Sequence, residues 1–313
     1  MTYDVIIIGG GCAGLTAGIY CGRADLKTLI FCGGFDDKGG MLSKTSDVEN
    51  FPGFPDGILG YDLVANMEKQ AVKYSVEIKN EYVCSISKND DIFSVSTDTE
   101  TFDTKTIIIC TGTTPRKLGL ENEDTLWSHG ISSCAVCDGA LYKKKKIVVV
   151  GGGDSAMEEA LFLTKFSDVI LIHRKDTLRA SKIMQNRVLS NKKITIYYNT
   201  VVTKLNGTNK LESINIKNLE NNNEEMLEVN GLFYGLGSYP NTEKFKDLVD
   251  LDENGYIIVG DEEYKTVSSV RGIFAAGDVH DTIYRQAITA AGFGCQAGLD
   301  VIKYINNELK ESV

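Results

Sequence analysis

The sequence contains little proline, few histidines and no long hydrophobic run. Of its 313 residues, only 4 are proline and 3 are histidine. Apolar runs such as residues 5–8 and 147–150 are far shorter than the ~20 residues that a membrane-spanning helix needs. The residues after Met1 do not show the pattern of a secretory signal, which is a charged region, an apolar region and a cleavage site. These absences argue against a membrane protein and predict a cytoplasmic one.

Basic residues are also in the minority. The chain has 33 Lys and Arg against 43 Asp and Glu, a net charge of −10. Nucleic-acid binders usually carry a basic excess, and the longest basic run, residues 143–146, is interpreted as a solvated approach to a strand. Nucleic acid is therefore not an expected partner. A hydrophobic content of 42% with 24% charge is typical of a globular protein, and the length favours two domains.

Cysteine is too sparse for a disulfide framework. Eight cysteines are spread over the chain, and most are expected to be small hydrophobic core residues. Only Cys134 and Cys137 are close enough in sequence to act as a pair.

A repeated glycine-rich segment is the main positive feature. Residues 5–14 and 147–156 align without a gap, and each copy precedes a helical pattern (residues 15–24 and 157–166) and a short apolar strand (28–31 and 169–172). Alternating runs within residues 83–109 and 194–234 predict antiparallel strands. The sequence therefore predicts an α/β fold of two Rossmann-like dinucleotide-binding domains, each with a parallel sheet and an antiparallel β-meander.

The prolines suggest the domain boundaries. Pro52 and Pro55 are expected in a loop, and Pro115 and Pro240 just beyond the last strands of the two domains. Segments 113–116 and 238–244 would then be linkers. The prediction is a second domain at 115–243 inserted into a first domain formed by 1–114 and 244–313, which ends in a helix over 284–305.

The first glycine motif predicts a dinucleotide site. Gly9, Gly11 and Gly14 lie between a strand and a helix, where glycines bring a pyrophosphate onto the helix N-terminus. An acidic residue that binds the ribose is expected at the end of the next strand, ~20 residues further on. Residues 31–34 contain none, and the aspartates at 36–37 come slightly too late. The ribose contact is therefore unassigned.

The second glycine motif is followed by cations. Gly151, Gly153 and Ala156 repeat the pattern, with an alanine that close helix packing tolerates. The end of its second strand carries His173, Arg174, Lys175 and Arg179. Such residues favour a 2′-phosphate, and so NADP(H) over NAD(H); the alternative is a solvated basic loop. Lys175 lacks the guanidinium fork of arginine, which predicts moderate selectivity.

The segment from Cys134 to Asp138 predicts redox chemistry. Two thiols separated by two residues can form a disulfide and accept two electrons, as many as one hydride delivers. The alternatives are half of a zinc site or two inert core cysteines in an irregular segment. Asp138 is a candidate general acid for a departing thiolate, or a plain turn aspartate.

A last motif ends the final strand. Gly277 and Asp278 can offer backbone groups and a carboxylate to ribityl or ribose hydroxyls, and residues 285–287 open the last helix, whose dipole could stabilise a reduced isoalloxazine. The small residues at 290–298 are expected to form a close-packing face.

Together these residues resemble the low-molecular-weight, bacterial-type thioredoxin reductases over nearly the whole chain. The resemblance rests on the first glycine motif, Gly39-Gly40, residues 48–55, Thr111-Gly112, residues 134–139, residues 151–156, residues 173–175 with Arg179, residues 277–279 and residues 285–287. The Cys-x-x-Cys-Asp segment discriminates most, because the related two-domain flavin ferredoxin reductases lack it.

The resemblance implies a thioredoxin-disulfide reductase, and a homodimer, that uses FAD and NADPH. The implied FAD residues are Gly9, Gly11, Gly14, Asn50, Thr111, Gly112, Gly277, Asp278, Arg285, Gln286 and Ala287. The implied NADPH residues are Gly151, Gly153, Ser155, Ala156, His173, Arg174, Lys175 and Arg179. Cys137 would face the flavin, Cys134 would attack the thioredoxin disulfide, and Asp138 would be the acid. The family alternates two domain orientations, which predicts hinges at the two linkers.

Two departures from the family and several alternative functions accompany this interpretation. Met41 stands where the family commonly has glutamine, and Lys175 where it commonly has arginine. A dithiol oxidase or a ferredoxin-driven reductase would not need the nicotinamide motif. An alkyl hydroperoxide reductase flavoprotein would carry a further N-terminal dithiol domain. A redox sensor would lack turnover.

Overall fold

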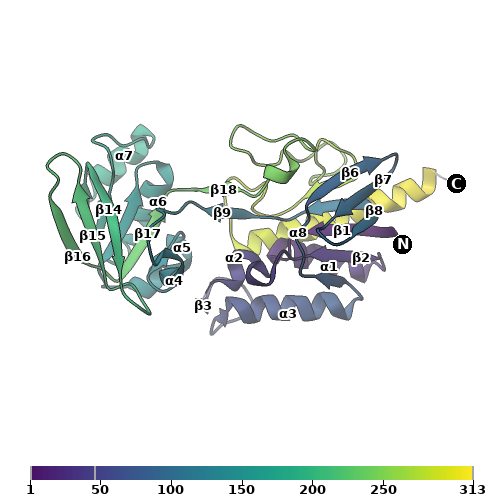
Figure 1. Ribbon diagram of the computed structural model, residues 1–313, viewed down its shortest axis with the longest axis horizontal. Coiled ribbons are helices and arrows are strands. Elements are labelled where there is room, and N and C mark those ends of the chain that lie inside the picture. The colour runs from purple at the N-terminus through teal and green to yellow at the C-terminus, as the bar shows by residue number, and fades with distance from the viewer. Residues whose placement is uncertain (1, 46, 312–313) are drawn as a thin grey trace. The chain divides into compact units, whose positions relative to one another are not determined.

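The chain forms two compact units in the computed structural model, which describes residues 2–45 and 47–311 (Figure 1). Unit 1 comprises residues 1–114 and 239–313, and unit 2 comprises residues 115–238. The expected return point at residue 244 is five residues late. Residues 239–243 belong to unit 1 because Asn241 exchanges hydrogen bonds with Thr111 and its N–H donates to the Gly112 carbonyl at 3.0 Å.

Unit 1 is built on a mixed sheet. Its strand order is β5-β2-β1-β8-β7-β6, with β19 paired to β8. The parallel strands are β1 (Thr2–Ile8), β2 (Thr28–Phe31), β5 (Glu77–Lys79), β8 (Thr101–Ile109) and β19 (Ile273–Ala275), and the antiparallel hairpin is β6 (Ser85–Asn89) with β7 (Ile92–Ser96). The apolar runs of β1 and β8 are buried, as expected of strands covered on both faces.

Three longer helices accompany this sheet: α1 (Cys12–Arg23), α3 (Gly60–Lys73) and α8 (Ala287–Glu311). A short helix, α2 (Gly40–Ser43), and a small hairpin, β3 (Asp47–Val48) with β4 (Ile58–Leu59), complete this part of unit 1. Helix α8 packs closely on α1, because a Cβ at Gly294 would lie 2.1 Å from the Ala13 carbonyl oxygen. The expected close-packing face is confirmed.

Helix α8 begins three residues later than expected. Asp281 is buried and its carboxylate accepts the backbone N–H groups of Ile283, Tyr284 and Arg285. Arg285 also adopts a positive φ of 47°. This turn satisfies the backbone without a helix, so the helical hydrogen bonds start only after it.

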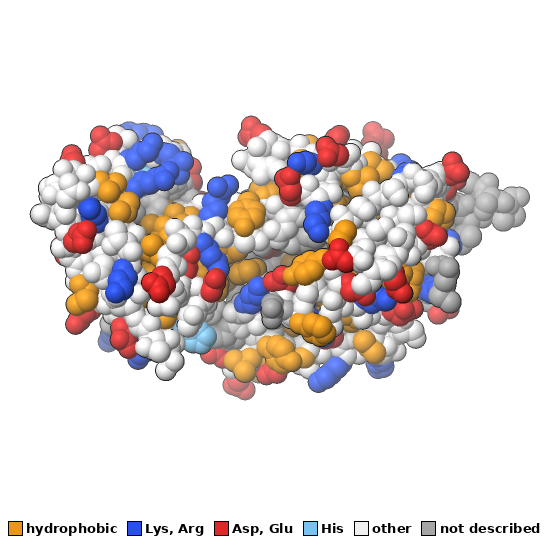
Figure 2. Space-filling model, viewed as in Figure 1, with side chains coloured by type: hydrophobic (Ala, Val, Ile, Leu, Met, Phe, Trp, Pro, Cys, Tyr) orange, Lys and Arg blue, Asp and Glu red, His pale blue; other side chains and the backbone are white. Residues whose placement is uncertain are grey.

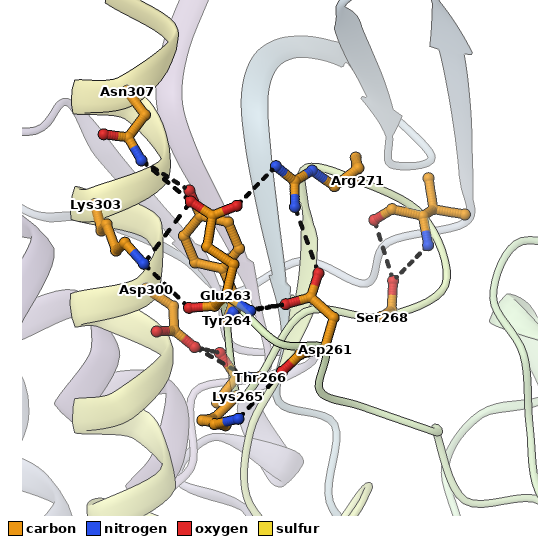
Figure 3. Close-up of polar contacts among 11 residues, drawn as sticks. Asp261, Glu263, Tyr264, Lys265, Thr266, Ser268, Arg271, Asp300, Lys303 and Asn307 are labelled. Atoms are coloured by element: carbon orange, nitrogen blue, oxygen red, sulfur yellow. Dashed lines mark hydrogen bonds and ion pairs between the residues drawn. The ribbon is translucent and has the colours of Figure 1, made fainter.

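A polar network ties the loop before β19 to α8 (Figure 3). The Arg271 guanidinium pairs with Asp261 at 3.4 Å and with Glu263 at 3.3 Å, while Lys303 on α8 lies 3.7 Å from Glu263. Asp300, also on α8, accepts both the N–H and the hydroxyl of Thr266. The loop is therefore held to the helix by several charged contacts at once.

Unit 2 repeats the parallel sheet on a smaller scale. Its order is β10-β17-β11-β12-β13, beside a separate antiparallel sheet β14-β15-β16. The parallel strands are β10 (Ile131–Ser132), β11 (Ile147–Gly151), β12 (Val169–Ile172), β13 (Ile194–Tyr197) and β17 (Gly231–Gly235). The antiparallel strands are β14 (Thr200–Asn206), β15 (Ser213–Asn218) and β16 (Glu224–Glu228), and the helices are α4 (Glu123–Leu126), α5 (Ala135–Asp138), α6 (Asp154–Leu163) and α7 (Lys182–Leu189).

Two strands of unit 2 differ from the expected antiparallel group. Strand β13 pairs parallel with β12, because α7 connects them as a crossover and returns the chain in the same direction. Strand β17 pairs parallel with β11 and β10, and all five of its residues are buried. Burial of the whole strand is typical of a parallel sheet covered on both faces.

The connecting segments are short strands. Strands β9 (Thr113–Pro115) and β18 (Ser238–Pro240) pair with each other, so Pro115 and Pro240 end strands instead of lying outside regular structure. Proline is tolerated at such edges because its missing N–H removes no required ladder bond.

Four of the eight cysteines are core residues, fewer than the majority that the sequence predicts. Cys12, Cys21, Cys32 and Cys110 are buried, whereas Cys84 is exposed. Burial raises the pKa of the Cys21 thiol to about 12, which keeps it protonated.

No helix in the described part of the chain combines the length and the hydrophobicity needed to cross a membrane.

Candidate redox and dinucleotide sites

The glycine turn of unit 1 has the geometry of a dinucleotide cradle. A Cβ at Gly9 would lie 2.2 Å from the Cys110 carbonyl oxygen, and a Cβ at Gly14 would lie 1.8 Å from the Gly9 carbonyl oxygen. At Gly11, by contrast, the nearest atom to a Cβ is the Gly39 carbonyl oxygen at 3.8 Å. Close packing thus requires the first and third glycines, while the second leaves its side open for a pyrophosphate.

The glycine turn of unit 2 has the same open side. Gly151 has a φ of 154°, and at Gly153 nothing lies within 4 Å of a Cβ. Ala156 fits at the third position because the neighbouring strand ends in Gly235, where a Cβ would lie 2.4 Å from the Ala156 Cα. Ser155 lies in the first turn of α6, half-buried. This cradle also fits a pyrophosphate.

The predicted cations lie on a loop that is fixed to this turn. Arg174, Lys175 and Arg179 are exposed, and the Arg179 N–H donates to the Gly152 carbonyl at 2.7 Å. Asp154 accepts both the N–H and the hydroxyl of Ser181, which ties the end of the loop to α6. Figure 2 shows Lys and Arg side chains gathered over the α7 region of unit 2. The structure therefore presents exposed cations beside the cradle.

His173 differs from these cations. Its side chain is only 4% exposed, and its ring fills the space where Gly152 lacks a Cβ. One ring nitrogen, Nε2, lies 2.9 Å from the Thr177 carbonyl oxygen, and burial lowers the pKa of the ring. The neutral, buried imidazole packs between Gly152 and the loop, and it adds no positive charge to the surface of the loop.

In unit 1, several implied FAD residues from distant segments lie together. The Asn50 side chain donates to the Gln286 Oε1 at 3.2 Å, although 236 residues separate them. Gly277, with a φ of 80°, precedes Asp278 just after β19. Burial raises the pKa of Asp278 to about 6; the charge of Asp281 adds to this and Arg285 opposes it.

The remaining implied residues lie near the ends of β8 and α8. Thr111 and Gly112 follow β8 and are half-buried, and nothing lies within 4 Å of a Cβ at Gly112. Arg285 belongs to the turn before α8, and Ala287 is the first residue of that helix. Met41, the departure from the family, lies on α2 with 39% of its surface exposed. The donors and open glycines present fit a dinucleotide such as FAD.

Cys134 and Cys137 form a disulfide at the start of α5. Their Cα atoms are 5.3 Å apart, and the Cys137 N–H donates to the Cys134 Sγ at 3.2 Å. The segment expected to be irregular is thus a one-turn helix, held by a bond from the Ala135 N–H to Glu159. Both cysteines are half-buried, with Val136 55% exposed between them. Sulfur atoms bonded to each other are not thiolate ligands of zinc, and a disulfide can accept two electrons.

Asp138 lies directly after this disulfide. Its side chain is half-buried, and burial raises its pKa, while a hydrogen bond with Ser132 opposes the rise. A carboxyl group with a raised pKa retains a proton closer to neutral pH than an exposed aspartate does. The position and the pKa direction both suit an acid that protonates a thiolate.

Sequence reasoning missed three supporting residues. Glu159 holds the disulfide helix, Asp281 shapes the turn before α8, and Asn241 binds the end of β8. Each acts on a residue that is distant in sequence or through loop backbone, so no spacing pattern marks it. Only Asp281, followed by a threonine in a loop, carries a weak turn preference.

The family comparison agrees with this geometry. Residues 3–294 match the pyridine nucleotide-disulphide oxidoreductase family, so the chain belongs to it. Thioredoxin reductase from Streptomyces clavuligerus is 46% identical over 96% of this chain and 94% of its own length. NADPH-dependent thioredoxin reductase 3 of Arabidopsis thaliana is 47% identical over 98% of this chain, which spans 60% of that protein.

Solved structures give the same result. The crystal structure of thioredoxin reductase from Streptococcus pyogenes superimposes with a TM-score of 0.91 at 39% identity, covering 98% of this chain and 99% of that one. Within the family, the chain therefore belongs with the low-molecular-weight thioredoxin reductases, as the sequence predicts.

Proposed function

We propose that the protein transfers electrons from NADPH through FAD to its Cys134–Cys137 disulfide and then to thioredoxin. The observation that carries this proposal is the disulfide itself, which lies half-buried beside a protonatable Asp138 in the unit that bears the cationic nucleotide loop. The relatives named thioredoxin reductase support it.

FAD is assigned to unit 1. When bound, FAD supplies the two-electron chemistry that connects a hydride donor to a disulfide. Gly11 leaves room for the pyrophosphate of FAD at the start of α1. The Asn50–Gln286 pair and Asp278 offer polar groups to the rest of the FAD. Because the pKa of Asp278 is about 6, its side chain would be a hydrogen-bond donor when protonated and an acceptor when ionised.

NADPH is assigned to unit 2. Gly153 leaves room for the pyrophosphate at the start of α6, and the exposed Arg174, Lys175 and Arg179 would pair with the 2′-phosphate. The hydrogen bonds from this loop to Gly152 and Asp154 fix its distance from the cradle. Lys175 contributes charge without a fork, which favours moderate selectivity over NADH.

Dithiol exchange then follows from the cysteine pair. Two electrons and two protons convert the Cys134–Cys137 disulfide into two thiols. Cys134 loses its proton to solvent, and its thiolate attacks one sulfur of the thioredoxin disulfide; the departing thiolate takes a proton from Asp138. Cys137 then gives its proton back to Asp138 and attacks the Cys134 sulfur of the mixed disulfide. The second thioredoxin thiolate takes a proton from solvent, which releases reduced thioredoxin and restores the original disulfide and the protonated Asp138.

An anaerobic spectral titration tests the whole proposal. The purified protein is expected to show a flavin spectrum that NADPH bleaches at lower concentration than NADH does, and that oxidised thioredoxin restores. A flavin that NADPH bleaches but only oxygen restores would instead indicate a dithiol oxidase. A protein without flavin would contradict the proposal.

Cytoplasmic location stays a prediction from the missing secretory signal and membrane span, and the homodimer and the alternation of two domain orientations stay predictions of the resemblance. A crosslink between the units, placed away from both cradles, is expected to stop multiple turnovers if alternation is required. Turnover at the uncrosslinked rate would contradict it.

A further inference from the structure

A buried carboxylate oxygen in unit 1 lacks a protein partner. Glu68 lies on α3, and its Oε2 pairs with the Lys38 ammonium at 2.9 Å. Its Oε1 is buried and has no hydrogen-bond partner among the described residues. Leaving a charged acceptor buried without a partner costs free energy, so a hydroxyl or amide from a ligand would stabilise this position.

Glu68 lies near the strand end where the sequence lacks an acidic residue. Cys32 directly follows β2, and its Sγ fills the space beside the glycine turn, 2.2 Å from where a Cβ of Gly10 would lie. Burial raises the pKa of the Cys32 thiol to about 12; the charge of Glu68 adds to this and Lys38 opposes it. The carboxylate is therefore an electrostatic neighbour of the residue at the end of β2.

Helix α3 also approaches the open side of the cradle. A Cβ at Gly39 would lie 2.7 Å from the Val64 side chain, and the Gly39 carbonyl oxygen lies near the open face of Gly11. Val64 and Glu68 are four residues apart on α3, so they share one face of that helix. Gly39 thus links the pyrophosphate position to the helix face that carries Glu68.

We propose that Glu68 Oε1 accepts a hydrogen bond from a hydroxyl of the adenosine ribose of the dinucleotide in unit 1. In Rossmann folds an acidic residue at the end of the second strand makes this bond. Here Cys32 follows that strand, and the proposed substitute for the acidic residue is the Glu68 carboxylate on α3. Lys38 pairs with the other carboxylate oxygen and leaves Oε1 for the ligand. The inference rests on the proposed function, because that function assigns FAD to unit 1.

Exchange of the bound flavin tests the inference. The holoenzyme is incubated with mixtures of FAD and an FAD analogue that lacks either the 2′- or the 3′-hydroxyl of the adenosine ribose, and the retained flavin is identified by chromatography. A hydrogen bond to a charged acceptor is worth ~1.5–3 kcal/mol, so the native protein is expected to prefer FAD about tenfold or more over one analogue.

Variants at Glu68 assign this preference to its carboxylate. Glu68→Met keeps the length of the side chain without an acceptor, and the preference is expected to fall to about twofold or less. Glu68→Gln retains a neutral acceptor and should give an intermediate value, which decides the question if the methionine variant does not fold. Asp62→Asn, an exposed change on the same helix, is the matched control and should keep the native preference.

The outcomes separate the two proposals. Native discrimination in both Glu68 variants, or no discrimination by the native protein, would overturn the ribose contact while leaving the reductase proposal intact. A native protein that neither contains nor takes up FAD would instead contradict the proposed function, and the ribose contact with it.

Discussion

The two glycine turns reach close packing with different residues at the third position of the motif. In unit 1 the third position is Gly14 and the neighbouring strand is followed by Cys110, whereas in unit 2 the third position is Ala156 and the neighbouring strand ends in Gly235. A Cβ at Gly14 would meet the Gly9 carbonyl oxygen within its own turn, whereas the Ala156 Cβ fits because Gly235 has none. An alanine in the motif therefore depends on a glycine about eighty residues away.

The units also differ in charge around their cradles. Unit 2 presents exposed cations on a loop tied to its glycine turn, whereas the corresponding region of unit 1 has Cys32 beside the Lys38–Glu68 ion pair. Two copies of one motif thus carry different side chains at the position that meets the ribose in Rossmann folds. This difference is expected to determine which dinucleotide each unit binds.

The redox pair is the largest difference between the units, because only unit 2 carries it. Cys134→Ser and Cys137→Ser are each expected to lower thioredoxin reduction by about 10³-fold or more, since dithiol exchange needs both sulfurs. NADPH-driven bleaching of the flavin should remain, because it precedes exchange. Cys84→Ser, which changes an exposed free cysteine of unit 1, is the control and should leave both rates unchanged.

Adding a methyl group should show how tightly each turn is packed. Gly14→Ala and Gly235→Ala are each expected to destabilise the protein by about 3 kcal/mol, because the new Cβ overlaps backbone atoms. Ala156→Gly alone should cost about 1 kcal/mol through helix propensity, but it should recover part of the loss in the Gly235→Ala background. Urea unfolding of the native protein, the two single variants at Gly235 and Ala156 and the double variant measures this coupling. Strictly additive changes in the free energy of unfolding would contradict it.

The acid beside the disulfide should show in the pH profile. Asp138→Asn is expected to slow thioredoxin reduction by roughly 10–100-fold. Because burial raises the pKa of Asp138, the native rate should decline as pH rises through that raised pKa, and the variant should lack this decline. Asp168→Asn, an exposed change elsewhere in unit 2, is the comparison. An unchanged profile in the Asp138 variant would leave this residue as a turn aspartate.

Removing the cations should make the second cradle more like the first. The double variant Arg174→Ala/Arg179→Ala is expected to raise the KM for NADPH about tenfold, because charge-assisted bonds to the 2′-phosphate are lost. The KM for NADH should change less than about twofold, since NADH lacks that phosphate. Arg187→Ala removes an exposed arginine from α7 and is the control. Equal losses for both nucleotides would indicate a solvated loop.

Ion pairs are expected to give the smallest difference in stability between the two units. Arg271→Leu in the unit 1 network should lower the free energy of unfolding by about 1 kcal/mol, because Arg271 contacts two carboxylates and the Tyr264 ring. Lys146→Met breaks an exposed pair with Glu228 in unit 2 and should cost about 0.3 kcal/mol. Urea midpoints compare them, and equal effects would show that the network adds nothing.

The sequence predicted the elements that depend on local pattern. Strands β2 and β12 were expected with the bounds that they have, because apolar runs between polar turns define them. The start of α8 was not predicted, since it depends on how the buried Asp281 bonds to its loop. The direction of β13 depends on the crossover through α7, and the return to unit 1 depends on Asn241.

The candidate site was likewise predicted where chemistry follows from spacing. The glycine motifs and the cysteine pair could be identified in this way, and the paired cysteines do form a disulfide. The burial of His173 was missed, because it depends on the absent Cβ of Gly152, which opens space for the ring. Glu68 also carries no motif, because it lies on α3, away in sequence from both the glycine motif and β2.

The pairing of β8 with β19 has a consequence for biosynthesis. Residues 107–109 pair with residues 273–275, and α1 packs against α8 at the opposite end of the sequence. A ribosome therefore completes every residue of unit 2 before it makes the strand and helix that complete unit 1. The strands of unit 1 that are synthesised first therefore keep part of their apolar surface exposed until β19 and α8 are made, whereas unit 2 can fold before then.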